Sequence, residues 1–168
     1  PFGAMPGARD LRRGEGWSRG EAQVSVRWPP RPFSLPDANM VSLVLRVDWR
    51  DRQLWLMGDA LDFQEGDLLD LGDPGSGSHR LLKAGHHGSR SSSEADWIRA
   101  LEPELTLITA GRHNRFGHPH AETLATLGHH PVFLVGAAHG LRLEAEAGGW
   151  MVQEGLGGTR HLPAPAPR

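Results

Sequence analysis

The sequence contains no cysteine and no tyrosine, and Lys83 is its only lysine. Without cysteine there can be no disulfide bond, no thiolate metal ligand and no cysteine nucleophile, so any metal ion must be bound by histidine and carboxylate groups. The same absence removes the redox chemistry from which a cellular compartment is often inferred. Positive charge comes almost entirely from arginine, which we interpret first as a bias of base composition.

Long apolar runs are also missing. None approaches the ~20 residues that are needed to cross a bilayer, and no signal peptide is recognisable near the start. We therefore expect this piece to be soluble. A net charge of −2 argues against a surface that binds polyanions throughout, but leaves room for a local basic patch. The length of 168 residues, with 38% hydrophobic residues, predicts one globular domain or part of one.

The chain divides into three parts by composition. Residues 1–20 are rich in glycine and arginine and are expected to form a flexible lead-in. Residues 21–156 carry the regular apolar patterns of a folded domain. Residues 157–168 end in a proline-rich stretch and are expected to be a disordered tail. Because the chain begins with Pro1 rather than methionine, we expect it to be a fragment or a processed piece of a longer protein.

Apolar periodicity and turn residues predict hairpins first and alternating strands and helices later, which favours an α/β domain with mixed sheets. The stretches 42–47 and 53–57 are expected to pair as an antiparallel hairpin. Strands are predicted for residues 24–28, 42–47, 53–57, 81–84, 105–109, 132–135, 141–145 and 150–153, and helices for residues 93–101 and 119–127.

The stretch LLKAGHHGSRSSS at residues 81–93 holds the most suggestive chemistry. A buried strand is followed by His86 and His87 between two glycines, which allow a sharp turn at the strand exit. Ser91 and Glu94 have the spacing of a capping box at the start of the next helix. A histidine pair can also lie in a solvated loop. If the residues around the pair are ignored, a solvated loop is a somewhat better interpretation than a metal site.

Polar residues follow two other strands in the same way. Asp59 comes after the strand at 53–57, with a glycine before it, and a carboxylate in such a position can bridge two cations. A turn aspartate that bonds its own backbone is the common alternative. Arg112, Asn114 and His118 follow the strand at 105–109. Three such exits in one sheet could face a common cleft.

These motifs resemble the C-terminal metallo-β-lactamase-like domain of the ComEC family of DNA-uptake (competence) proteins. The matching pieces, in the order of the family, are SLVLRV at 42–47, LWLMGDA around Asp59, LLKAGHHGS at 81–89 and AGRHNRFGHPH at 110–120, and the resemblance covers residues 22–145. GHHGS followed by GxxNxxGHP is far more specific than either half. The wider superfamily also contains phosphorylcholine esterases and other phosphodiesterases with the HHGS signature.

The resemblance implies a role for each candidate residue. Asp59 would bridge two divalent metal ions, zinc or manganese, and one of His86 and His87 would be a ligand. We favour His87 as the ligand and His86 as a phosphate contact, although the order stays open. His118 would be a proton donor or a substrate contact. Supporting or substrate-binding roles are implied for Asn114, Ser89 and Ser92. A hydrogen-bonded loop and a helix cap are equally good interpretations of these three residues. Phosphate contacts are implied for Arg90, Arg112 and Arg115.

Two departures from the family pattern limit what this chain can do. The run Asn39-Met40-Val41-Ser42 keeps only the first Asn and the Ser of the family's Asn-Asp-Asn-Ser. More important, the HxHxDH motif that supplies most metal ligands in this fold is absent from all 168 residues. We therefore expect a partial αββα sandwich, its C-terminal half to two-thirds, which binds at most one cation weakly and has little activity alone.

The function implied for the intact protein is hydrolysis of phosphodiesters in single-stranded DNA during uptake. The parent protein would lie in the cytoplasmic membrane, with this domain on its outer face beside the membrane channel domains of the same protein. Two alternatives stay open: a small-molecule phosphodiesterase of the same fold, and a non-catalytic docking or DNA-contact module.

Overall fold

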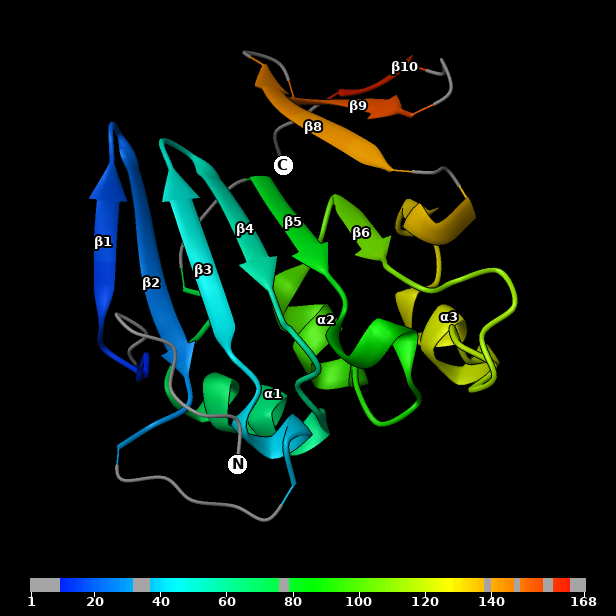
Figure 1. Cartoon of the computed structure of the whole chain (residues 1–168). Coiled ribbons are helices and arrows are strands. Elements are labelled where there is room, and N and C mark those ends of the chain that lie inside the picture. The colour runs from blue at the N-terminus through cyan, green and yellow to red at the C-terminus, as the bar shows by residue number, and fades with distance from the viewer. Residues whose placement is uncertain are drawn as a thin grey trace.

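A mixed sheet of seven strands forms the centre of the computed structural model, which describes residues 10–31, 37–75, 79–137, 140–146, 149–155 and 159–163. The strands lie in sequence order across this sheet (Figure 1), so the predicted α/β domain with a mixed sheet is confirmed. They are β1 (Gly16–Arg19), β2 (Ala22–Trp28), β3 (Val44–Trp49), β4 (Arg52–Leu56), β5 (His79–Lys83), β6 (Leu105–Ile108) and β7 (Val132–Leu134). A second sheet contains β8 (Leu141–Glu146), β9 (Gly149–Glu154) and β10 (Thr159–Pro163), in the order β10-β9-β8.

The direction of the strands changes at β4. Strands β1 to β4 pair antiparallel, whereas β4 to β7 are parallel. Parallel neighbours need crossover connections, and one helix follows each of β4, β5 and β6. The carboxyl ends of these three strands therefore lie at the same edge of the sheet. The helices are α1 (Asp62–Asp70), α2 (Ala95–Leu101) and α3 (Ala121–Leu127), and short 3-10 segments cover Asn39–Val41, Gly85–Gly88 and Val135–Ala137.

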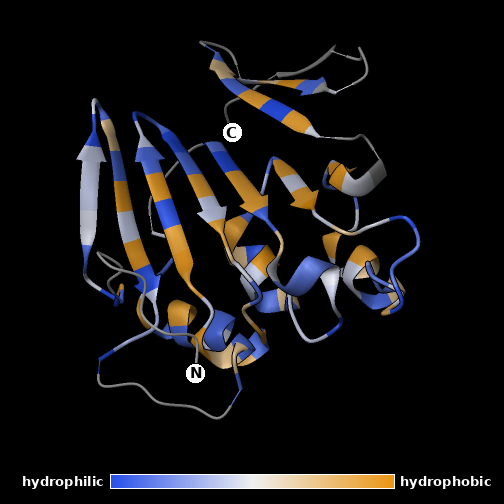
Figure 2. Cartoon of the chain, viewed as in Figure 1, coloured by the Kyte–Doolittle hydropathy of each residue, from blue (hydrophilic) through white to orange (hydrophobic). Residues whose placement is uncertain are grey.

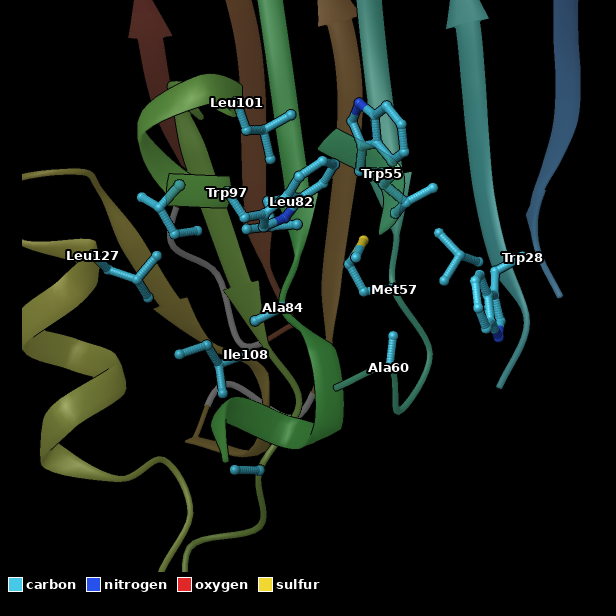
Figure 3. Close-up of a cluster of buried hydrophobic side chains, with 14 residues drawn as sticks. Trp28, Trp55, Met57, Ala60, Leu82, Ala84, Trp97, Leu101, Ile108 and Leu127 are labelled. Carbon is cyan, nitrogen blue, oxygen red and sulfur yellow. The ribbon is translucent and has the colours of Figure 1, made fainter. Parts of the chain in front are cut away.

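The main core lies between the sheet and these helices. Trp55 of β4 meets Trp97 of α2 edge-to-face, with ring centroids 5.1 Å apart, and Figure 3 shows the apolar side chains that surround them. Each helix contributes through buried leucines or larger residues, and Figure 2 shows the apolar positions alternating with polar ones along the strands. The cluster contains Trp28, Val44, Trp55, Met57, Ala60, Leu68, Leu82, Ala84, Trp97, Ile98, Leu101, Ile108, Ala110 and Leu127.

The second sheet covers the other face of the parallel strands. Leu81 and Leu82 are neighbours in β5, so their side chains point to opposite faces; Leu82 joins the core under the helices, and Leu81 joins a second cluster with Trp150 and Val152 of β9. That cluster also contains Leu105, Leu107 and Phe133. The parallel half of the sheet is thus covered on both faces.

The predicted strands and helices are confirmed, and no bound differs from the structure by more than two residues. Two strands and one α-helix were not predicted. Strand β1 lies inside the expected lead-in and is held by antiparallel pairing with β2; helix α1 lies in an acidic, glycine-containing stretch and is held by the burial of Leu68. Strand β10 lies inside the expected tail and pairs with β9. Residues 1–9 of the expected lead-in, and residues 157–158 and 164–168 of the expected tail, lie outside the described residues.

The predicted capping box at the start of α2 is wrong. Glu94 occupies the N-cap position without a side-chain cap bond, and the Ser91 hydroxyl bonds the Ser89 hydroxyl instead. The carboxylate of Glu65, on α1, accepts the backbone N–H groups of Ser93 and Glu94, both at 2.8 Å. Glu65 is 1% exposed, and its burial raises its pKa to about 8. A tertiary contact therefore replaces the local cap.

The helices described by the structure are all too short or too polar to span a membrane.

Candidate functional site

Asp59 and His87 meet at the edge where β4 and β5 end. The His87 Nε2 atom lies 3.4 Å from Asp59 Oδ1, and both side chains are about half exposed, 45% and 42%. The sequence-based prediction that these residues from different strand exits converge is confirmed. A charge-assisted hydrogen bond would be shorter, at about 2.7–2.9 Å. The two atoms are therefore close neighbours, at a separation longer than that of a charge-assisted hydrogen bond.

The other ring nitrogen of His87 fixes which nitrogen carries the proton. His87 Nδ1 lies 2.6 Å from the carbonyl oxygen of Thr109 and 3.1 Å from its hydroxyl. A carbonyl can only accept, so Nδ1 carries the hydrogen in the neutral ring and Nε2 presents a lone pair toward Asp59. Histidines that bind metal ions characteristically donate their second N–H in this way. Thr109, at the exit of β6, thereby orients a residue at the exit of β5; this role was not predicted.

The histidine pair lies in a backbone conformation that is uncommon outside glycine. His86 and His87 both have positive φ angles, 42° and 55°, which cost free energy in a residue with a Cβ atom. The flanking glycines leave room for two close contacts. A Cβ at Gly85 would lie 2.6 Å from the Ala60 carbonyl oxygen, and one at Gly88 would lie 2.8 Å from Pro119 Cβ. The tight turn thus brings the loops after β4, β5 and β6 into contact.

Asp59 is held by contacts to its own backbone and to that of Gly58. The Ser42 hydroxyl accepts the N–H of Asp59 at 2.7 Å. The carbonyl oxygen of Gly58 accepts the His86 N–H at 3.2 Å and the Lys83 Nζ at 2.7 Å. Burial lowers the pKa of Lys83, while the charge of Asp59 opposes this shift. Ser42 is the serine that the chain shares with the family pattern, so the sequence could have indicated that this residue supports the site. For Lys83 the sequence gives no indication except that it is the only lysine.

Asn114 organises the loop that carries His118. Its Nδ2 donates to the carbonyl oxygens of Gly111 and His118, both at 2.7 Å, and its Oδ1 accepts the His118 N–H at 2.9 Å. The loop is joined to the histidine turn because the His120 N–H donates to the Gly88 carbonyl at 2.9 Å. Asn114 is thus placed to shape the loop, which matches the alternative interpretation of this residue.

His118 lies between other rings. Its centroid is 5.5 Å from that of His86, 4.8 Å from that of His120 and 5.7 Å from that of Phe116, on which it stacks at 25°. The pKa of His118 is lowered by desolvation first, and then by the nearby His120 and His86. His118 thus lies beside His86, and its role as a proton donor or substrate contact stays a prediction. The two imidazoles are therefore neighbours, and the charges of His87 and Asp59 also act on His118.

The remaining predicted residues divide between the loop interior and its surface. Ser89 is buried and its hydroxyl bonds that of Ser91, so the hydroxyl predicted to contact substrate faces the interior. Ser92 is buried and donates to the Gly85 carbonyl. Three arginines are exposed: Arg112, Arg115 and Arg90, the last paired with Glu122 at 3.2 Å.

The donor set at Asp59 and His87 suits a divalent cation but is small. Two ligands at about 2.1 Å on one tetrahedral ion lie about 3.4 Å apart, which is the distance between His87 Nε2 and Asp59 Oδ1. Within the described residues, no group of three or more histidine, aspartate or glutamate side chains is arranged to bind a metal. In the described part of the chain, Asp59 and His87 are thus a pair of neighbouring side chains, fewer than the four ligands of a closed zinc site.

Comparison with known proteins gives two informative similarities, both to competence proteins. The chain is 31% identical over 123 residues to ComE operon protein 3 of Bacillus subtilis (strain 168); the match covers 73% of this chain and 16% of that protein. It is 35% identical over 83 residues to competence protein ComA of Neisseria gonorrhoeae, covering 49% and 12% respectively. No family model matches the chain. These similarities support a place for the chain among proteins of DNA uptake, of which it spans only a small part.

Proposed function

We propose that this chain forms one side of a metal-dependent phosphodiester hydrolase site that processes single-stranded DNA during uptake. The observation that carries the proposal is the pairing of His87 Nε2 with Asp59 Oδ1 at 3.4 Å, with His87 Nδ1 bonded to the Thr109 carbonyl. The similarity to competence proteins supports DNA as the substrate and a membrane channel of the parent protein as the neighbour.

Asp59 and His87 would hold a divalent cation, zinc or manganese, between them. When bound, such an ion lowers the pKa of coordinated water and neutralises charge on a phosphoryl group. His86 and His118 lie beside this pair and supply N–H groups that contact a phosphate oxygen or carry a proton. Water molecules or residues of another segment would supply the further ligands of this ion. The ligands of a second ion in a dinuclear site would have the same sources.

We also propose that the seven-stranded sheet is one half of an αββα sandwich. The pairing register places Val24 opposite Val47 and Leu45 opposite Leu56, on the face away from Trp55 and its helices. These side chains are only partly buried. A further sheet, distinct from the sheet of β8, β9 and β10, would cover them if it packed on this face. Exchange of Val47 for glutamate is then expected to lower the binding of a dye that reports apolar surface, without loss of the fold.

Cleavage of labelled single-stranded DNA with manganese tests the catalytic proposal. We expect the chain to bind at most one cation weakly and to cleave slowly, and we expect Asp59→Ala and His87→Ala to lose both properties. His129→Ala is the matched control, because His129 is exposed and lies in the turn after α3. No bound metal and no cleavage by the unaltered chain would contradict the proposal.

A second candidate function is a non-catalytic DNA-contact module. It is favoured by one observation, the presence of only two potential protein ligands at the site in the described part of the chain. The same experiment distinguishes the two candidates, because the module would bind the strand without metal and would leave it intact.

A further inference from the structure

Phe116 is the most exposed large hydrophobic side chain among the described residues, at 61%. Single exposed apolar residues are common on protein surfaces and need no special explanation. Phe116 differs from such residues in two ways. It belongs to a loop of polar and charged residues that also carries His118, and its ring contacts the side chains of His118 and Arg115. Its surroundings therefore decide what it can bind.

Two neighbouring groups build a layered arrangement on Phe116. The His118 ring stacks on it, with centroids 5.7 Å apart and planes at 25°, and the Arg115 guanidinium lies over the Phe116 ring at 4.9 Å. His118 in turn meets His86 edge-to-face, and the adjacent His87 faces Asp59. A continuous set of ring contacts thus leads from an exposed aromatic ring to the proposed hydrolytic pair.

The loop that presents Phe116 is held in place before any ligand arrives. Asn114 makes three hydrogen bonds that span the loop, to Gly111 on one side and to His118 on the other. A ring presented on a fixed loop loses little conformational entropy when a ligand stacks on it. The arrangement is therefore suited to binding a planar group.

We infer that the Arg115 guanidinium and the Phe116 ring beneath it form a stacking platform, on which a nucleobase lies against the guanidinium, for the strand whose phosphodiester lies at Asp59 and His87; this inference rests on the proposed function. Every base has a π-face that stacks on aromatic rings and guanidinium groups, so such a platform binds single strands without sequence preference. A quaternary ammonium group is disfavoured, because the positive charge of Arg115 already lies over the Phe116 ring. The platform therefore selects nucleic acid over a choline-like ligand.

The test compares two fluorescent strands of equal length, oligothymidylate and a strand of abasic phosphodiester units, by fluorescence anisotropy with and without manganese. We expect the full chain to bind oligothymidylate about tenfold more tightly than the abasic strand, within the range found for base stacking on one aromatic ring. Phe116→Ala should lose this preference while its affinity for the abasic strand stays unchanged, and Phe116→Trp should restore it.

Phe63→Ala is the matched control. Phe63 is also exposed, at 40%, but it lies on α1 against Trp28, so its loss should leave the preference intact. Equal affinity of the unaltered chain for both strands would overturn the platform and leave the hydrolase proposal standing. An equal loss of both affinities in Phe116→Ala would also overturn it. Binding of neither strand would overturn the platform and the proposed function together.

Discussion

Glu65 is predicted to make the stability of the fold depend on pH. Its carboxylate is buried and accepts two backbone N–H groups where α2 begins, and burial raises its pKa from 4.5 to about 8. A group whose pKa is raised by folding contributes stability that is fully present below its unfolded pKa. That stability is lost as the pH rises through the folded pKa. The free energy of unfolding should therefore fall between pH 4.5 and pH 8.

The size of this effect has an upper limit. Each pKa unit corresponds to about 1.4 kcal/mol, so the shift of Glu65 allows a loss of at most about 5 kcal/mol across that range. The Ser93 and Glu94 N–H groups favour the carboxylate and oppose the shift, so the pKa of about 8 is already the balance between burial and these two hydrogen bonds. Glu65→Gln removes the titration but keeps a carbonyl oxygen that accepts one N–H.

Urea unfolding at a series of pH values measures the effect. The unaltered chain should lose stability between pH 4.5 and pH 8, whereas Glu65→Gln should show a flatter profile in that range. Glu21→Gln is the control, because Glu21 is exposed and pairs with Arg50 on the surface. Parallel profiles for the unaltered chain and Glu65→Gln would refute the reasoning.

Two further predictions concern the loops around the histidine turn. Gly88→Ala should destabilise the fold by about 1–3 kcal/mol more than Gly117→Ala. Both glycines have positive φ angles, but only a Cβ atom at Gly88 would meet Pro119. Thermal melting of the two variants measures the difference, and equal losses of stability would contradict the contact. Asn114→Ala removes three hydrogen bonds, each worth about 1 kcal/mol, and should loosen the loop around His118. Amide hydrogen exchange at that loop measures this, and unchanged protection would refute it.

The convergence of three strand exits could be predicted because buried strands followed by glycine are visible in the sequence. It depends on β4, β5 and β6 being parallel neighbours, which places their carboxyl ends at one edge. Asp59, His86 and His87 were found in this way.

The groups that orient these residues could not be predicted in the same way. Thr109 bonds a ring that is 22 residues away, and Ser42 bonds a backbone N–H that is 17 residues away. Such contacts are set by the pairing of the sheet and not by local spacing. The failed capping box has the same cause, since Glu65 reaches the start of α2 from another helix and leaves Ser91 to bond within its own loop.

The central claim is that Asp59 and His87 share a cation, and manganese titration followed by NMR of the histidine side chains tests it most directly. Because manganese is paramagnetic, a bound ion should broaden the signals of His87 and its neighbour His86 at concentrations that leave those of exposed His129 sharp. Asp59→Asn should abolish this selectivity. Equal broadening of His87 and His129, or selective broadening that persists in Asp59→Asn, would contradict the account.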